Sequence, residues 1–223
     1  MAAGDAGDEQ GAVPATTPVT EYLADRLSGA GTPGRQRLAE YLRQLGVVDR
    51  AIYAAVAAAP TADLDGPIRG LSNLADNSRL WLAIAAGLAI GGGRNGRRAA
   101  AAGAVSIGVT SALVNLGVKP LYARQRPDRA GAGVPGQRYV HMPSSSSFPS
   151  GHSAAGFAFA TAVGRELPWL GSGLRFAAAA VAYSRVHTGV HYPGDTVIGS
   201  LIGAGTGQAV AGLMDRKVPK TVI

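Results

Sequence analysis

The chain has 223 residues and a net charge of +7, with 47% hydrophobic and only 16% charged residues. This length suits one domain with a sizeable core and is barely enough for two. The absence of cysteine excludes disulfides, thiolate chemistry and cysteine-ligated metal sites. The positive charge would suit nucleic acid. However, the basic residues stand in small groups at the ends of apolar runs and only 6% of residues are aromatic, which disfavours that class.

Residues 1–33 are rich in alanine, glycine, threonine and proline and contain almost no large apolar side chains. Such a segment cannot bury enough apolar surface to fold, so we predict a disordered polar tail, with a docking segment as the alternative. The charged residues near the N-terminus are acidic, namely Asp5, Asp8 and Glu9, so the basic region followed by an apolar segment that a signal peptide requires is not seen. No cleavable signal peptide is therefore expected.

Residues 34–79 are expected to form helices of mixed polarity. Residues 34–45 carry leucines and a tyrosine at helical spacing and predict a charged helix. Residues 47–59 are apolar except for Asp49 and Arg50, and this run is too short to span a bilayer without its flank or a tilt. Residues 60–79 predict a loop and an amphipathic piece at the membrane interface.

Five further apolar runs follow. The clearest is 99–118, with 20 uncharged residues, and 196–214 adds 19 more. Shorter runs cover residues 80–93, 151–164 and 176–183, and the last must borrow its flanks to cross a bilayer. The 32 glycines are typical of membrane helices, where small residues permit close contact. We predict an all-α, multi-pass transmembrane helix bundle of about six helices over residues 34–220, with five as the alternative.

Three polar blocks interrupt these runs: residues 119–127, 149–152 and 184–195. If successive helices cross the membrane in alternation, all three blocks emerge on one face. Arginine and lysine gather at the opposite ends of the runs. We expect a multi-pass protein of the plasma membrane, and the positive-inside rule predicts that the blocks lie on its extracytoplasmic face.

The first and third blocks supply three cations that suit a phosphate ester: Lys119, Arg126 and Arg185. Cleavage of such an ester requires neutralised phosphate oxygens, a nucleophile and a proton for the leaving oxygen. Arginine presents a planar fork that matches two phosphate oxygens. Three other arginines are interpreted as helix-end residues that snorkel to the membrane interface: Arg124, Arg129 and Arg138.

The second block, Pro149-Ser150-Gly151-His152, stands where a loop becomes a helix. Ser150 can cap the helix, Gly151 lets the backbone approach a ligand, and the first helical N–H groups attract an anion. His152 would then stand beside the bound anion and protonate the leaving oxygen. An ordinary helix start is the plainer alternative.

In the third block, His191 and Asp195 are four residues apart, and Pro193 and Gly194 can open a helix between them. A carboxylate beside an imidazole fixes its tautomer and stabilises its cation. His191 is therefore the candidate nucleophile and Asp195 its partner.

A metal site is disfavoured, because the acidic residues near the three blocks are only Asp128 and Asp195 and three cations would repel a metal ion. The remaining histidines, His141 and His187, are interpreted as loop or packing residues.

Together the blocks resemble the signature of the type 2 phosphatidic acid phosphatase (PAP2) superfamily. That signature is Lys, six residues, Arg-Pro; then Pro-Ser-Gly-His; then Ser-Arg, five residues, His, three residues, Asp. All eleven fixed positions are present here. The resemblance covers roughly residues 47–214 and implies the helical fold that membrane PAP2 phosphatases share with vanadium haloperoxidases.

The resemblance also implies roles for the residues of the blocks. It implies five phosphate-binding residues: Lys119, Arg126, Ser150, Gly151 and Arg185. It implies that His191 forms a phosphohistidine with Asp195 as its partner, and that His152 is the general acid. No cofactor and no metal is needed in this family.

Membrane members of the family act on lipid phosphates. The expected substrates are phosphatidic acid, phosphatidylglycerol phosphate and polyprenyl mono- or diphosphates, with decaprenylphosphoryl phosphoribose, a precursor of cell-wall arabinan, among the candidates. The alternatives are a vanadium-haloperoxidase-like enzyme, a soluble acid phosphatase of the same superfamily and a non-enzymatic membrane protein. The long uncharged runs disfavour the first two, and a non-enzymatic protein has no reason to gather these polar groups on one face.

Overall fold

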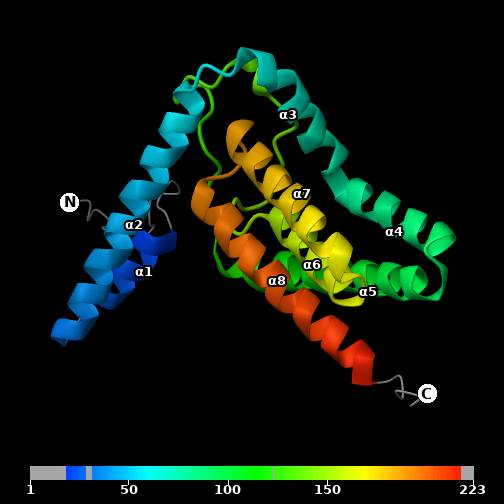
Figure 1. Cartoon of the computed structure of the whole chain (residues 1–223). Coiled ribbons are helices and arrows are strands. Elements are labelled where there is room, and N and C mark those ends of the chain that lie inside the picture. Colours follow the sequence, from blue (N-terminus) through cyan, green and yellow to red (C-terminus); the bar gives the residue numbers. More distant parts are fainter. Residues whose placement is uncertain (1–18, 29–31, 123, 217–223) are drawn as a thin grey trace, which may run out of the picture.

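The computed structural model describes residues 19–28, 32–122 and 124–216 (Figure 1). Within them lie eight α-helices: α1 (Val19–Ser28), α2 (Pro33–Ala58), α3 (Ala62–Leu74), α4 (Arg79–Gly91), α5 (Gly93–Ala112), α6 (Gly151–Glu166), α7 (Pro168–His187) and α8 (Pro193–Arg216). Short helical segments are η1 (Asp76–Ser78), η2 (Leu113–Val118), η3 (Lys119–Leu121) and η4 (Gly136–Arg138). The described residues contain no strand, so the predicted all-α bundle is confirmed.

Helix α6 lies at the centre of the bundle and packs against α5, α7 and α8 (Figure 1). Three glycines of α8, each one turn from the next, face backbone carbonyl oxygens of α6 and of its N-cap residue so closely that a Cβ would collide with them. The pairs are Gly199 with Ser150, Gly203 with Ala154, and Gly207 with Ala158. Small residues therefore bring these two backbones into contact, as they do in membrane helix pairs.

Helices α3 and α4 form an arm that joins the bundle beside α7 and α5. Trp81, near the start of α4, is fully buried against Phe159 of α6, with 5.6 Å between ring centroids. Such an aromatic pair contributes about 0.5–1.5 kcal/mol beyond the burial of its area. It holds the arm in place, and the turn η1 between α3 and α4 consequently contacts α6.

Two helical segments are long and apolar enough to cross a membrane, Gly93–Leu121 and Pro193–Asp215. They contain the two longest uncharged runs of the sequence. Large apolar side chains also cover the outside of the bundle, among them Ile90 (87% exposed), Leu116 (80%) and Phe176 (78%). A bilayer would cover a surface of this kind. Six crossings stay a prediction.

The N-terminal part differs from the prediction in two ways. The predicted segments 34–45 and 47–59 form one continuous helix, α2, which ends at Ala58. The predicted disordered tail is wrong over Val19–Ser28, which form α1 and pack along α2, where Arg50 Nη1 lies 2.6 Å from Glu21 Oε1. This short stretch has a helical periodicity that the composition of the whole tail conceals. Thr32 and Pro33, the last two residues of the predicted tail, are the N-cap and the first residue of α2, and residues 1–18 and 29–31 lie outside the described residues.

Arg138 does not snorkel to an interface, contrary to the prediction, because it is only 1% exposed. Its guanidinium donates to Asp65 Oδ1 on α3 at 2.8 Å and to the carbonyl oxygens of Val56 and Ala59 at 3.0 and 2.6 Å. The carbonyl groups at the end of a helix have no intrahelical donor. His187 of α7 also contacts Asp65, with 2.9 Å between Nε2 and Oδ1, so one buried cluster joins α2, α3 and α7.

Replacing Arg138 by leucine is expected to destabilise the protein strongly. The change leaves the buried Asp65 carboxylate without its arginine and removes the guanidinium donors from the carbonyl oxygens of Val56, Ala57 and Ala59. The expected cost is about 3–5 kcal/mol. Thermal unfolding in detergent, followed by tryptophan fluorescence, should show the midpoint falling by on the order of 10 °C.

The matched control is Arg69→Leu, because Arg69 is exposed on α3 and donates to Gln137 O at 3.0 Å. Its unfolding midpoint should shift by less than about 3 °C. Equal shifts in the two variants would contradict the stabilising role of the Arg138 cluster.

Candidate active site

The three sequence blocks meet at one end of the bundle, around a cavity of about 570 Å³. Five of the predicted residues line its wall: Lys119, Arg126, Gly151, His152 and His191. Three others are buried outside that wall: Ser150, Arg185 and Asp195. The alternating helices thus bring the blocks together, as expected from their positions in the chain.

The first block begins where α5 ends. After the π-helical segment η2, the chain reaches Pro120, which has no backbone N–H to donate to a further helical turn. Lys119 therefore stands at the helix end, where its Nζ donates to Ser145 Oγ at 3.2 Å. Arg126 follows on the loop and donates to the carbonyl oxygens of Ser145 and Val190 at 3.1 and 2.9 Å. Both cations are held by neutral oxygens.

The second block opens α6. Ser150 caps this helix: its Oγ accepts from the N–H of Ser153 at 3.4 Å, and its own N–H donates to the carbonyl of Asp195 at 3.0 Å. The Ser150 side chain is fully buried, whereas Gly151 and His152 belong to the cavity wall. The first turn of α6 therefore borders the cavity, and the N-terminus of a helix favours an anion there.

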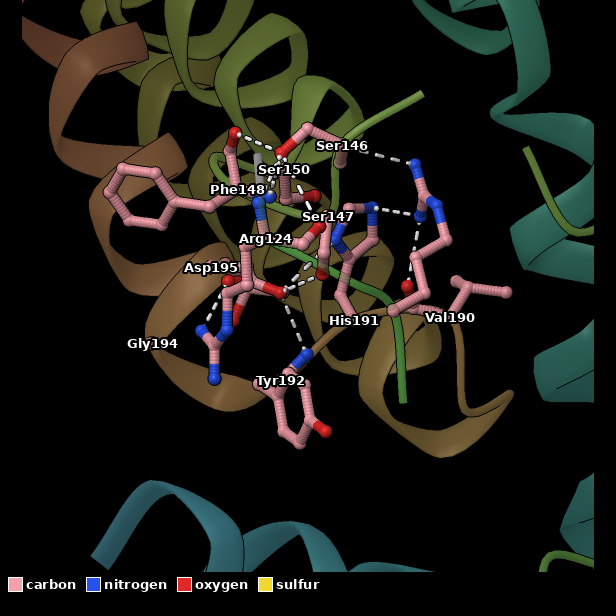
Figure 2. Close-up of polar contacts among 12 residues, drawn as sticks. Arg124, Ser146, Ser147, Phe148, Ser150, Val190, His191, Tyr192, Gly194 and Asp195 are labelled. Carbon is pink, nitrogen blue, oxygen red and sulfur yellow. Dashed lines mark hydrogen bonds and ion pairs between the residues drawn. The ribbon is translucent and has the colours of Figure 1, made fainter. Parts of the chain in front are cut away.

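His191 lies in the turn between α7 and α8, beside Asp195 (Figure 2). The buried Asp195 carboxylate accepts from the N–H of Tyr192 at 2.9 Å and from the hydroxyl of Ser147. Nδ1 of His191 is 3.5 Å from Asp195 Oδ2, and its Nε2 is 3.2 Å from Arg126 Nη1. An arginine N–H can only donate, so Nε2 is the acceptor and the ring proton is on Nδ1, on the side of Asp195.

The environment of His191 keeps its imidazole neutral. Burial lowers the pKa of His191 to about 3, and the charges of Arg126 and Arg185 lower it as well, while Asp195 acts in the opposite direction. At neutral pH the ring therefore has a lone pair on Nε2, which is what a nucleophile requires.

The prediction that Arg124 snorkels to the membrane interface is also wrong, because the residue is only 6% exposed. Its Nη1 lies 2.6 Å from Asp195 Oδ1 and its Nη2 lies 2.8 Å from Asp49 Oδ2 on α2, while the guanidinium stacks over the Tyr192 ring at 4.1 Å. With a carboxylate on two sides, this arginine supports Asp195 from outside the cavity. Arg129 is half-buried, and its interfacial position stays a prediction.

Arg185 is buried on α7 next to the turn between α3 and α4. Its Nη1 donates to Ser72 Oγ at 2.6 Å and lies 3.5 Å from Asp76 Oδ1. The same oxygen of Asp76 is 2.8 Å from Nε2 of His152. Asp76 therefore connects a cation of the third block with the histidine of the second.

Asp76 is not among the residues predicted from the sequence, in which only Asp128 and Asp195 are acidic residues near the blocks. The one signal was the polar Asp-Asn-Ser stretch at 76–78, which separates two apolar segments. Ser147, which donates to Asp195, was also missed within its run of serines. Across the part of the chain that the structure describes, no three histidine or acidic side chains are grouped so that they could hold a metal ion.

The chain is similar to known proteins of the family whose signature the three blocks resemble. A sequence profile of the PAP2 superfamily matches residues 99–219. The decaprenylphosphoryl-5-phosphoribose phosphatase of Mycobacterium tuberculosis is 36% identical over 169 residues, which are 72% of this chain and 89% of that enzyme. The putative undecaprenyl-diphosphatase YbjG of Escherichia coli is 41% identical over 69 residues, 30% of this chain and 35% of that protein. These relatives are named as phosphatases, which fits the predicted phosphoric ester hydrolase.

Two solved structures have the same fold. The transmembrane PAP2-type phosphatidylglycerolphosphate phosphatase of Bacillus subtilis has a TM-score of 0.59 and 24% identity, covering 92% of this chain and 98% of that one. LpxE of Aquifex aeolicus has a TM-score of 0.57 and 21% identity, covering 74% and 95% of the two chains. From the profile match, the mycobacterial relative and the shared fold, we conclude that the chain belongs to the PAP2 superfamily.

Proposed function

We propose that this protein is an integral-membrane lipid phosphatase that cleaves a phosphomonoester or a pyrophosphate of a lipid through a phosphohistidine on His191. The observation that carries the proposal is the cavity in which Nε2 of His191 stands beside Arg126, with His152 on the same wall. The catalytic domain in this proposal is residues 34–220.

Lys119 and Arg126 suit a phosphate because they have no protein counter-ion. Within the described ranges, neither lies at ion-pair distance from a carboxylate, and their partners are neutral oxygens such as those of Ser145. By contrast, Arg124 and Arg138 each face an aspartate. A partly buried cation without a counter-ion is stabilised when an anion binds beside it. The pair therefore favours a phosphate over a neutral ligand.

In the proposed reaction, Nε2 of His191 attacks phosphorus while the bond to the leaving oxygen breaks, and His152 gives that oxygen its proton. Asp195 stabilises the positive charge that develops on the His191 ring. The three cations of the sequence blocks and the first turn of α6 neutralise the non-bridging oxygens. Water then attacks the phosphohistidine, His152 accepts its proton, and inorganic phosphate leaves.

The cavity wall also contains apolar side chains, which favour a lipid ester. These are Leu82 of α4, Ile107 of α5 and Ala155 of α6. An alkyl chain attached to the bound phosphate can lie along this wall, as hydrophobic ligands do in largely apolar pockets. The names of the relatives make polyprenyl phosphates, polyprenyl diphosphates and decaprenylphosphoryl phosphoribose the leading candidates. Phosphatidic acid and phosphatidylglycerol phosphate are the others.

We place the active site on the extracytoplasmic face of the plasma membrane. Arg97 and Arg98 near the start of α5, Arg165 near the end of α6 and Arg216 at the end of α8 lie at the helix ends remote from the three blocks. The positive-inside rule puts such residues in the cytoplasm.

A substrate panel in detergent tests this proposal. The purified protein should release phosphate from at least one polyprenyl or glycerolipid phosphate in the presence of EDTA, and much faster than from water-soluble sugar phosphates. Vanadate should inhibit, because it mimics the five-coordinate state of phosphorus. Activity that is lost in EDTA and restored by a divalent cation would refute the metal-independent mechanism. Equal rates on sugar and lipid phosphates would refute the lipid specificity.

A further inference from the structure

The turn η1 brings a carboxylate to the cavity from outside the three blocks. Asp76 lines the cavity and precedes the residues matched by the family profile, which begin at 99. Its Oδ1 lies 2.8 Å from Nε2 of His152 and 3.5 Å from Nη1 of Arg185. Both partners belong to the proposed chemistry, one as the proton donor and the other as a phosphate-binding cation.

The hydrogen bonds that form the turn do not explain why the Asp76 side chain points toward His152. Asp76 accepts from the N–H of Arg79 with its backbone carbonyl, and the N-cap of α4 is Ser78. The turn contains two consecutive non-glycine residues in the left-handed region, Asn77 at φ 51° and Ser78 at φ 60°. Each such residue costs about 1–2 kcal/mol. This backbone strain lies in the turn that brings the Asp76 carboxylate to His152, and strained backbone is common at functional positions.

The contact with Asp76 defines the tautomer of His152. An ionised carboxylate only accepts, so Nε2 of His152 carries a proton and donates it to Asp76. In the described part of the chain, Nδ1 of His152 has no hydrogen-bond partner, and it is the nitrogen left for proton transfer. Burial and the charges of Arg185 and Arg126 favour the neutral ring, whereas Asp76 and a bound phosphate favour the protonated one.

We propose that Asp76 is a positioning residue for His152 and forms with it a second imidazole–carboxylate pair, beside the pair of His191 and Asp195. It orients the ring and, with phosphate bound, keeps it protonated. The proton on Nδ1 then passes to the leaving oxygen as the bond from that oxygen to phosphorus breaks. His152 regains a proton from the water that attacks the phosphohistidine. This assignment rests on the proposed phosphatase function.

The test compares two leaving groups in wild type and in Asp76→Asn, which keeps the shape of the side chain and removes its charge. The first substrate is the lipid phosphate cleaved fastest in the panel, whose alkoxide must be protonated. The second is 4-nitrophenyl phosphate, whose phenolate leaves without a proton. The ratio kcat/KM covers all steps up to departure of the leaving group. It should fall by about 100-fold or more for the lipid and by less than about 5-fold for the aryl ester.

Two further variants make the outcome decisive. Asp63→Asn removes an exposed carboxylate of α3 and should leave both rates within about twofold of wild type. Asp76→Glu keeps the charge but places it one methylene further out. This variant replaces Asp76→Asn in the test if thermal unfolding shows that Asp76→Asn does not fold. Its loss should be smaller and again confined to the lipid.

Equal losses on both substrates, or no loss on either, would overturn the role of Asp76 and leave the phosphatase function standing. If the wild-type protein cleaves no lipid phosphate in the panel, the proposed function is overturned, and the role of Asp76 with it.

Discussion

Replacement of His191 by alanine is expected to abolish turnover, with kcat on a lipid phosphate falling by about 10⁴-fold or more. In the proposed mechanism the imidazole supplies the attacking nitrogen, and its neighbours cannot replace it. Arg126 does not deprotonate in proteins, and Asp195 is buried with its oxygens engaged by Arg124 and Ser147. The measurement is phosphate release in detergent. Rapid quenching should capture an acid-labile phosphoenzyme from wild type and none from the variant.

Loss of activity could also follow from unfolding, because His191 is almost fully buried. Inorganic phosphate separates the two causes. If the cations still hold an anion, phosphate should raise the unfolding midpoint of His191→Ala as it does for wild type, since a ligand of the folded state stabilises it. A folded variant that retains near wild-type turnover would contradict the assignment of His191 as the nucleophile.

The second large effect is expected for Asp195→Asn, which should lower kcat by about 10³–10⁴-fold. The amide has the shape of the carboxylate but cannot stabilise the positive charge that the proposed mechanism places on His191. It also removes one of the two carboxylates that flank the buried Arg124, which should cost about 1.5–3 kcal/mol of stability. Steady-state kinetics and thermal unfolding of the same preparation measure the two effects.

The matched control is Asp49→Asn, which removes the other carboxylate beside Arg124, 2.8 Å from its Nη2. This change should destabilise the protein to a similar extent, because the same arginine loses a counter-ion. It should leave kcat within about 5-fold of wild type, because Asp49 does not touch His191. If both variants lose the same activity, Asp195 acts through Arg124 and the fold instead of through the imidazole.

Much of the fold follows from uncharged runs in the sequence. The run at 176–183 was too short for a membrane helix, and the structure shows that α7 extends it on both sides to Pro168 and His187. The expectation that Pro193 opens a helix is confirmed by the start of α8. Alternation of the helices was enough to bring Lys119, His152 and His191 to one cavity.

What the sequence could not reveal is which partner each charge would find. The arginine of the Arg-Pro pair and the arginine two residues before it look alike in the sequence, yet Arg126 has neutral partners and Arg124 has two carboxylates. Asp49 is 75 positions from Arg124, and Asp76 is 76 positions from His152. Such contacts depend on how α2 and the α3–α4 arm dock on the bundle, and no local spacing encodes that docking.

The glycine contacts between α6 and α8 have a consequence for how a lipid reaches the active site. These backbones touch at three successive turns, at Gly199, Gly203 and Gly207. No hydrocarbon chain fits through such a seam, so this side of the bundle is closed to lateral diffusion from the bilayer. The apolar side chains of the cavity, Leu82 and Ile107, stand on α4 and α5 instead. For the proposed substrate, the path from the bilayer to His191 therefore runs past α4 and α5.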